Sequence, residues 1–123
     1  MKAFVTGGTG FIGRTVVRKL IERGYSVSAL ARSESGGAVL RAMGATVVPG
    51  DITDRESMRE GMRGSDVVFH IAAIYQFTQE ALARAESVNV GGTRDVLELA
   101  VELGIPRIVY TSTVAVFGDT RGE

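Results

Sequence analysis

The most constraining feature of the sequence is a glycine-rich turn near the N-terminus, in which Gly7, Gly10 and Gly13 are spaced three apart. A short apolar run precedes this turn, and apolar residues at helical spacing follow it. A strand, a glycine turn and a helix in this order predict a loop that binds the pyrophosphate of a dinucleotide. An ordinary glycine-rich turn is the alternative, because 16 glycines produce such spacings by chance. The strand before the turn and the helix after it favour the phosphate-binding loop.

Each glycine has a predicted task in this loop. Gly7 permits the tight turn out of the strand, and Gly10 lets phosphates approach bare backbone. Gly13 lets the helix pack closely on the strand. The free N–H groups at the start of the helix, together with the helix dipole, then attract the anion.

Strand-like and helix-like segments alternate along the whole chain. The strands expected after the first βα unit are residues 26–31, 45–48, 66–73 and 107–111, and the expected helices include 36–43 and 79–103. This alternation predicts an α/β fold, a three-layer Rossmann-type doubly wound parallel sheet of about five strands in the order 3-2-1-4-5. Residues 1–123 are expected to form one NAD(P)-binding domain. The pair Gly91–Gly92 inside the last helix predicts a break there or a close contact.

Composition narrows the classes of partner. Fourteen basic residues balance fourteen acidic residues, which argues against a nucleic-acid or membrane-surface partner. The chain has no cysteine and one histidine, so a metal site is not expected. We expect a cytoplasmic protein. The single histidine, His70, lies on an apolar strand and is expected to be a core residue with a satisfied ring.

The end of the second strand bears on the choice of cofactor. An acidic residue there would bind the adenosine ribose hydroxyls of NAD, but the sequence has Ala31 and then Arg32. A guanidinium suits the 2′-phosphate of NADP, so the sequence favours NADP over NAD. The alternative is that Arg32 is a solvated loop residue.

Five stretches of the chain resemble the N-terminal half of the extended short-chain dehydrogenases/reductases, a family of nucleotide-sugar epimerases, dehydratases and reductases. The matching stretches are residues 6–13, 50–54, 70–73, 89–93 and 110–118. The resemblance implies a dinucleotide cofactor. The cofactor-binding residues expected from it and from the sequence are Gly7, Thr9, Gly10, Phe11, Ile12, Gly13, Arg32, Asp51, Ile52, Ala72, Ala73, Asn89 and Thr111.

The resemblance also implies roles for single residues. Phe11 and Ile12 would offer backbone N–H groups to the pyrophosphate, and Asp51 would bind the adenine amino group. Asn89 would order its helix, and Thr113 would hydrogen-bond the reacting oxygen of the substrate as a catalytic residue. Two alternatives stay open: Asp51 caps a turn, or Thr113 bonds its hydroxyl to backbone.

The catalytic Tyr-x-x-x-Lys pair that the resemblance implies is not present in the 123 residues. We therefore expect the chain to be the dinucleotide-binding portion of an enzyme that acts on a hydroxyl or keto carbon of a nucleotide-sugar or small ketone. A free-standing module that binds or senses the dinucleotide is the alternative. The strand at 107–111 would form an exposed edge, so self-association through that edge or the tail after it is expected.

Overall fold

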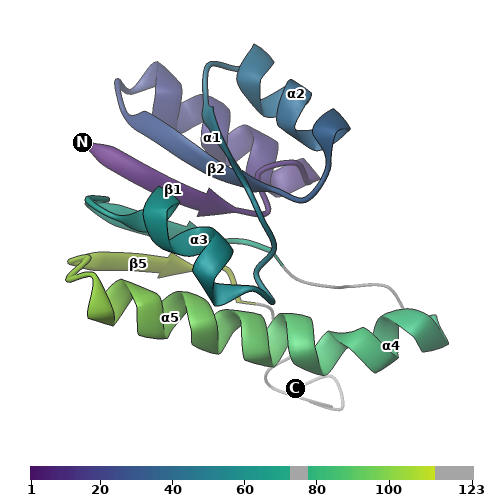
Figure 1. Cartoon of the computed structure of the whole chain (residues 1–123). Coiled ribbons are helices and arrows are strands. Elements are labelled where there is room, and N and C mark those ends of the chain that lie inside the picture. The colour runs from purple at the N-terminus through teal and green to yellow at the C-terminus, as the bar shows by residue number, and fades with distance from the viewer. Residues whose placement is uncertain (73–77, 113–123) are drawn as a thin grey trace, which may run out of the picture.

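Five parallel strands form the centre of the molecule, in the predicted order β3-β2-β1-β4-β5. The computed structural model describes residues 1–72 and 78–112 (Figure 1). Its elements are β1 (Lys2–Thr6), α1 (Phe11–Glu22), β2 (Ser26–Ala31), α2 (Glu34–Ala42), β3 (Thr46–Pro49), α3 (Arg55–Met62), β4 (Val67–His70), α4 (Gln79–Ala85), the π-helix η1 (Glu86–Gly91), α5 (Gly92–Glu102) and β5 (Arg107–Tyr110). The fold is therefore the predicted Rossmann-type α/β sheet.

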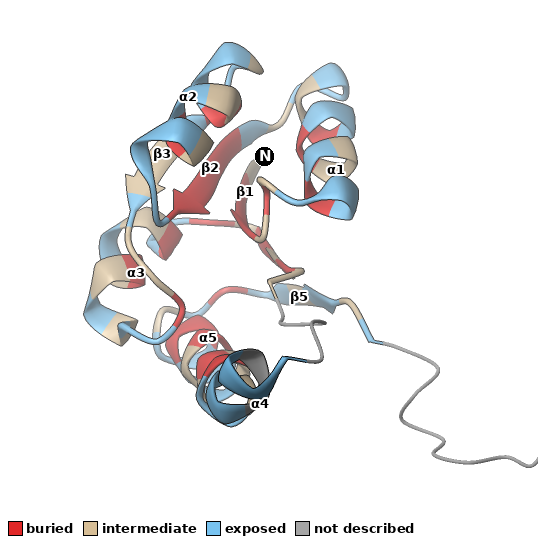
Figure 2. Cartoon of the chain, turned by 90° about the vertical axis from the view of Figure 1, so that its right-hand side faces the viewer, coloured by how far each residue is buried: buried red, intermediate tan, exposed pale blue. Residues whose placement is uncertain are grey.

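Helices cover both faces of this sheet, α1 and α2 on one side and α3 and α5 on the other (Figure 2). Alternate residues of β1 pack on opposite faces of the sheet. Ala3 and Val5 pack with Val17 and Leu40 of the first pair of helices. Phe4 is fully buried on the opposite face. Helices cover the central strands β1, β2 and β4 on both faces, and β4 is accordingly almost wholly apolar, as its sequence predicted, whereas β3 and β5 at the edges are more exposed.

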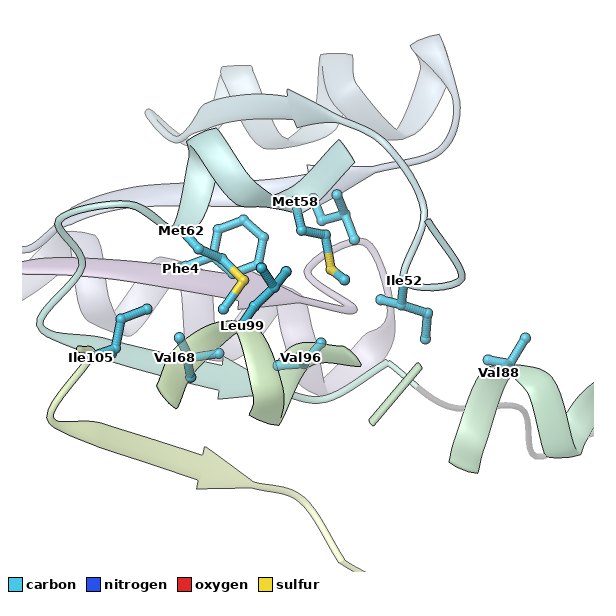
Figure 3. Close-up of a cluster of buried hydrophobic side chains, with 11 residues drawn as sticks. Phe4, Ile52, Met58, Met62, Val68, Val88, Val96, Leu99 and Ile105 are labelled. Atoms are coloured by element: carbon cyan, nitrogen blue, oxygen red, sulfur yellow. The ribbon is translucent and has the colours of Figure 1, made fainter. Parts of the chain in front are cut away.

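The core on the α3 and α5 side extends along the whole sheet (Figure 3). Its buried members are Phe4, Leu30, Ile52, Met58, Met62, Val68, Val88, Val96, Leu99, Ala100 and Ile105. Ile105 lies at one end of this cluster, and Ile52 and Val88 lie at the other, beyond the carboxyl ends of the strands. The second end connects the hydrophobic core with the functional groove described below.

Two ion-pair groups also join the helices on this side. Arg55 of α3 pairs with Asp95 and Glu98 of α5, and its Nη2 lies 2.7 Å from Oδ1 of Asp95. Arg59 pairs with Glu56 on its own helix and with Glu102 on α5. These contacts fix α3 against α5 at the rim of the core.

The boundaries of several elements differ from the prediction. The predicted strand 66–73 is shorter, because β4 ends at His70 and the next two N–H groups donate to the side-chain hydroxyl of Thr6. The helix predicted at 36–43 starts earlier as α2, because the Ser33 hydroxyl caps it by accepting a hydrogen bond from the N–H of Gly36. The strands predicted at 45–48 and 107–111 are Thr46–Pro49 and Arg107–Tyr110.

The long helix predicted at 79–103 is present as three joined segments, α4, η1 and α5, which run as one rod (Figure 1). The π-helical segment ends at Gly91, where the glycine pair predicted an irregularity. The predicted close contact is also present, because a Cβ on Gly92 would lie 2.8 Å from Cδ1 of Ile52. Within residues 1–72 and 78–112, no helix is long and apolar enough to cross a membrane.

Candidate functional site

A groove of about 430 Å³ opens at the carboxyl ends of the strands. The carboxyl edge of an open parallel sheet, at the point where the strand order reverses on either side of β1, is the expected place for a ligand. The groove is lined by Gly7, Thr9, Gly10, Phe11, Ile12, Gly13, Leu30, Ala31, Arg32, Asp51, Ile52, Ile71, Ala72, Val88 and Thr111.

The glycine loop forms one wall of the groove, and its shape depends on the missing side chains. Gly7 has a φ of 74°, and a Cβ there would lie 2.6 Å from the backbone N of Ala72. A Cβ on Gly13 would overlap the carbonyl oxygen of Gly7. A Cβ on Gly10 would meet only that same oxygen, at 3.5 Å, and otherwise open space. Gly7 therefore forms the predicted tight turn, and Gly13 packs on that turn at Gly7 and Gly8 instead of on the strand itself.

Helix α1 presents its N-terminus to the groove. Its N-cap is Gly10, which has no side chain with which to cap the helix. The first N–H groups of a helix have no partner within it, so those of Phe11 and Ile12 are available to an anion. The side chain of Arg14 donates from Nε to the carbonyl oxygen of Thr9 at 2.8 Å and so fixes the loop. The first turn of α1 carries no acidic residue that would oppose an anion.

Asp51 lies at the other end of the groove, in the turn after β3. Its Oδ1 accepts hydrogen bonds from the N–H and the hydroxyl of Thr53, both at 3.0 Å. Asp51 thus does cap a turn, the alternative left open above. Among the hydrogen bonds of the described residues, its Oδ2 has no donor, which leaves that oxygen for a ligand.

The charges around Asp51 keep it ionised. Burial raises the pKa of its carboxyl, but the hydrogen bonds from Thr53 and the charges of Arg32 and Arg84 outweigh burial and hold the pKa below its ordinary value. Asp51 is therefore an acceptor at neutral pH, with two guanidinium groups near enough to act on it. At this end of the groove, a hydrogen-bond acceptor therefore lies within electrostatic range of two positive charges.

The floor of the groove is the backbone of Ile71 and Ala72, just after β4. The hydroxyl oxygen of Thr6 accepts hydrogen bonds from both N–H groups, at 3.1 and 3.2 Å. The N–H of Ile71 also bonds the carbonyl oxygen of Thr6 at 3.3 Å. This turn brings the backbone and the small side chain of Ala72 to the groove.

His70 lies beneath this floor as a core residue with both ring nitrogens in hydrogen bonds, as expected. It is 1% exposed, and its ring stacks on that of Tyr110 at 5.6 Å between centroids. Burial lowers the pKa of His70 to about 4, so the ring is neutral at physiological pH.

Eleven of the predicted site residues line the groove, and among the described residues only Asn89 does not. Asn89 belongs to η1 and is not among the lining residues, although its carbonyl oxygen accepts a hydrogen bond from Thr93. Ala73 and the predicted catalytic residue Thr113 lie outside the described residues.

The groove also has lining residues that were not predicted, Leu30, Ala31, Ile71 and Val88. The first three flank predicted positions at strand ends, so their neighbours were a signal for them. Val88 comes from η1, and no local pattern in the sequence indicated that it would reach the groove.

A family model described as the NAD dependent epimerase/dehydratase family matches residues 3–123. Among curated relatives, a 4-hydroxy-2-methyl-3-oxo-4-farnesyl-3,4-dihydroquinoline-1-oxide ketoreductase of Stigmatella aurantiaca is 43% identical over 98% of this chain and 36% of its own length. A putative dihydroflavonol 4-reductase of a Synechocystis strain is 46% identical over 94% of this chain and 33% of its own length. The chain therefore spans about a third of the length of these relatives.

The fold also matches solved structures. The crystal structure of a short-chain dehydrogenase/reductase superfamily protein from Agrobacterium tumefaciens, with bound NAD, superposes with a TM-score of 0.83 and 30% identity. The match covers 96% of this chain and 34% of the other.

Proposed function

The chain belongs to the NAD dependent epimerase/dehydratase family, and we propose that its groove binds NADP in preference to NAD as the cofactor-binding portion of an oxidoreductase or epimerase. The observation that carries this proposal is the gathering of the glycine loop, Arg32 and Asp51 around one groove. The loop matches a pyrophosphate, and the other two residues match the polar groups of an adenosine. All three lie on the same carboxyl edge of the sheet.

The residues present fit such a cofactor. Bare backbone at Gly10 and the uncapped N–H groups of Phe11 and Ile12 suit the pyrophosphate. Oδ2 of Asp51 suits the adenine amino group, because the carboxylate is ionised and only Oδ1 is used in its turn. The half-buried Ala72 leaves space for the cofactor along the floor.

Arg32 supports NADP over NAD. It follows β2 directly, at the position where an acidic residue would bind the ribose hydroxyls of NAD. Its guanidinium lines the groove and acts electrostatically on Asp51. Two charge-assisted hydrogen bonds from this group to a 2′-phosphate would give the preference.

The proposed reaction is the transfer of a hydride between the nicotinamide and a hydroxyl or keto carbon of the substrate. A bound dinucleotide supplies the hydride acceptor and donor. The hydroxyl proton would be exchanged with the Tyr-x-x-x-Lys pair that the family resemblance implies, in a part of the enzyme that this chain does not span. Thr113 would orient the reacting oxygen.

The substrate class is a hydroxyl or ketone group on a small molecule or a nucleotide-sugar. The two curated relatives described above are named as reductases, which supports the ketone side of this choice. The family description names epimerases and dehydratases, which act on hydroxyl-bearing carbons, and does not itself name a substrate.

Isothermal titration calorimetry of the chain with NADP⁺ and with NAD⁺ tests the cofactor proposal. We expect binding of both, with NADP⁺ tighter. The circular dichroism spectrum of the same sample shows whether the chain is folded. A folded chain that binds neither dinucleotide contradicts the proposed cofactor site.

The second candidate is a binding or sensing module without catalysis, for which the groove alone would be sufficient. An immunoblot of the native source with an antibody raised against this chain separates the two. A species about three times larger supports the enzyme, and a species of the chain's own mass supports the module.

Self-association is proposed as well, through the outer edge of β5. Within residues 1–72 and 78–112, this strand pairs only with β4, and Val109 and Tyr110 are 46% and 54% exposed. An exposed edge with apolar side chains is a template for pairing with another strand.

A further inference from the structure

A series of hydrogen bonds runs through the buried side chain of His70 and links β4 with three other elements. Nδ1 of His70 lies 2.7 Å from the hydroxyl oxygen of Thr6 on β1. Nε2 lies 2.9 Å from the hydroxyl oxygen of Thr93 on α5. The Thr93 hydroxyl then donates to the carbonyl oxygen of Asn89, in the π-helix, at 2.5 Å. The site described above uses none of these side chains directly.

The number of donors around the Thr6 hydroxyl decides which atom donates in each of these hydrogen bonds. The Thr6 oxygen already accepts from the N–H groups of Ile71 and Ala72, so both of its lone pairs are in use. Its own proton must therefore go to Nδ1 of His70. Nε2 then carries the ring proton and donates to Thr93, whose proton goes to the Asn89 carbonyl. Thr6, His70 and Thr93 each donate one hydrogen bond, and all three bonds point from Thr6 toward Asn89.

A protonated ring does not fit this arrangement. A proton on Nδ1 would point a third donor at the Thr6 oxygen. In the part of the chain that the structure describes, the groups that face the ring are the hydroxyls of Thr6 and Thr93 and the stacked ring of Tyr110. None of these carries a negative charge at neutral pH that would compensate a buried imidazolium.

The two ends of this series of hydrogen bonds lie next to different parts of the groove. One end holds the N–H groups of Ile71 and Ala72, which form the groove floor. The other end holds the π-helix, whose Val88 lines the groove and packs with Ile52 in the core. Figure 3 shows Val88 and Ile52 at one end of the core cluster, and both residues also line the groove.

We propose that His70 is a positioning residue, held as the neutral Nε2–H tautomer, which fixes the groove floor at Ile71 and Ala72 in register with the π-helix that carries Val88. His70 does not touch the ligand; it acts through Thr6 on one side and Thr93 on the other. A break on the α5 side removes the fixed acceptor for the ring proton. The Nε2–H is then buried without an acceptor, so the ring shifts from its place, and the Thr6 hydroxyl loses its fixed orientation for holding the two floor amides.

The matched variants Thr93→Val and Thr93→Ser test this role. Valine has the shape of threonine without the hydroxyl, and serine restores the hydroxyl. In Thr93→Val we expect hydrogen exchange at the amides of Ile71 and Ala72 to become about tenfold faster, while exchange at Phe4 and Ala29 in the sheet centre changes little. Thr93→Ser returns the exchange rates to those of the unsubstituted chain. An even change over the whole sheet would mean a merely structural role and would overturn the proposal.

The tautomer is read directly from the ¹⁵N shifts of the single histidine, in the unsubstituted chain and without any ligand. Protonation of Nε2 alone is expected, and an Nδ1–H tautomer would overturn the proposal even if the variants fail to fold. The last measurement rests on the proposed function: dinucleotide affinity should fall about tenfold in Thr93→Val and recover in Thr93→Ser. Failure of the unsubstituted chain to bind a dinucleotide would contradict the cofactor site, and the exchange and tautomer results would still decide the role of His70.

Discussion

Gly92 packs directly against Ile52, so that a Cβ on the glycine would lie 2.8 Å from Cδ1 and 2.9 Å from Cγ1 of the isoleucine. Helix α5 therefore meets the turn after β3 with no side chain of its own between them. The neighbouring Gly91 is different, because a Cβ there would meet only the carbonyl oxygen of Glu86, at 3.9 Å. Both glycines have helical φ and ψ angles.

This contrast predicts opposite effects of alanine at the two positions. Gly91→Ala should raise the free energy of unfolding by about 0.5–1 kcal/mol, because alanine favours a helix over glycine. Gly92→Ala should lower it by about 1 kcal/mol, because overpacking against Ile52 exceeds the same helix gain. Urea denaturation at 25 °C measures both. The loss of stability caused by Gly92→Ala should be smaller when Ile52 is also replaced by alanine. A gain of stability from both single glycine variants would contradict the contact.

Alanine substitutions in the glycine loop should affect dinucleotide binding and the free energy of unfolding differently at different positions. Gly10→Ala should lower the free energy of unfolding by less than about 1 kcal/mol, because its Cβ faces open space. The same methyl group should weaken dinucleotide binding by more than about tenfold, since it occupies the path of the pyrophosphate. Gly13→Ala should cost about 3 kcal/mol or more, because its Cβ overlaps the Gly7 carbonyl. Calorimetric titration and urea denaturation of both variants give the comparison. Equal loss of stability in the two would be inconsistent with the loop geometry.

The buried His70 predicts a loss of stability in mild acid. Its pKa is about 4 in the folded chain against about 6.5 when unfolded, so below pH 6.5 the unfolded state takes up the proton first. The contribution is fully present above pH 6.5 and is lost as the pH falls toward 4. Between pH 7 and pH 5 the free energy of unfolding should fall by about 2 kcal/mol from this residue. Urea denaturation as a function of pH measures it, and the variant His70→Gln should remove this part of the slope.

Arg32 predicts the cofactor preference. Arg32→Ser should weaken NADP⁺ binding by about tenfold or more, through loss of charge-assisted hydrogen bonds to the 2′-phosphate, and should change NAD⁺ binding little. Arg41→Ser is the matched control, because Arg41 is an exposed arginine on α2 that pairs with Glu34 and does not line the groove. Titration calorimetry with each dinucleotide gives the answer. Equal weakening of both dinucleotides by Arg32→Ser would assign this arginine to another part of the cofactor.

The edge of β5 predicts a charge-sensitive self-association. Val109→Lys places a charge on the exposed edge strand and should shift the chain toward monomer. Sedimentation velocity at increasing concentration measures this shift. Val101→Lys, on the 78% exposed outer side of α5, is the control for an added charge elsewhere. A clean monomer of the unsubstituted chain at high concentration would exclude the edge as an interface.

Local signals in the sequence were enough for the sheet order and for most of the groove. The glycine spacing and the residues at strand ends depend only on neighbouring positions, so they were predictable. The end of β4 at His70 was not, because it depends on the hydroxyl of Thr6, 64 residues earlier. The π-helical turn was also missed, because apolar periodicity does not reveal which carbonyl each N–H selects. For the same reason, the approach of Val88 to the groove was not predicted.

The pairing of β1 with both β2 and β4 has a consequence for the order of folding. The pairing of β1 with β2 closes a short loop that contains only α1, so the first βαβ unit is able to form early. The contact with β4 joins residues more than sixty positions apart, and its closure costs more chain entropy. Because Gly7 takes its final shape against Ala72, just beyond β4, the phosphate loop is completed only at this later step. A dinucleotide should therefore slow unfolding of the finished sheet and leave the rate of its assembly unchanged.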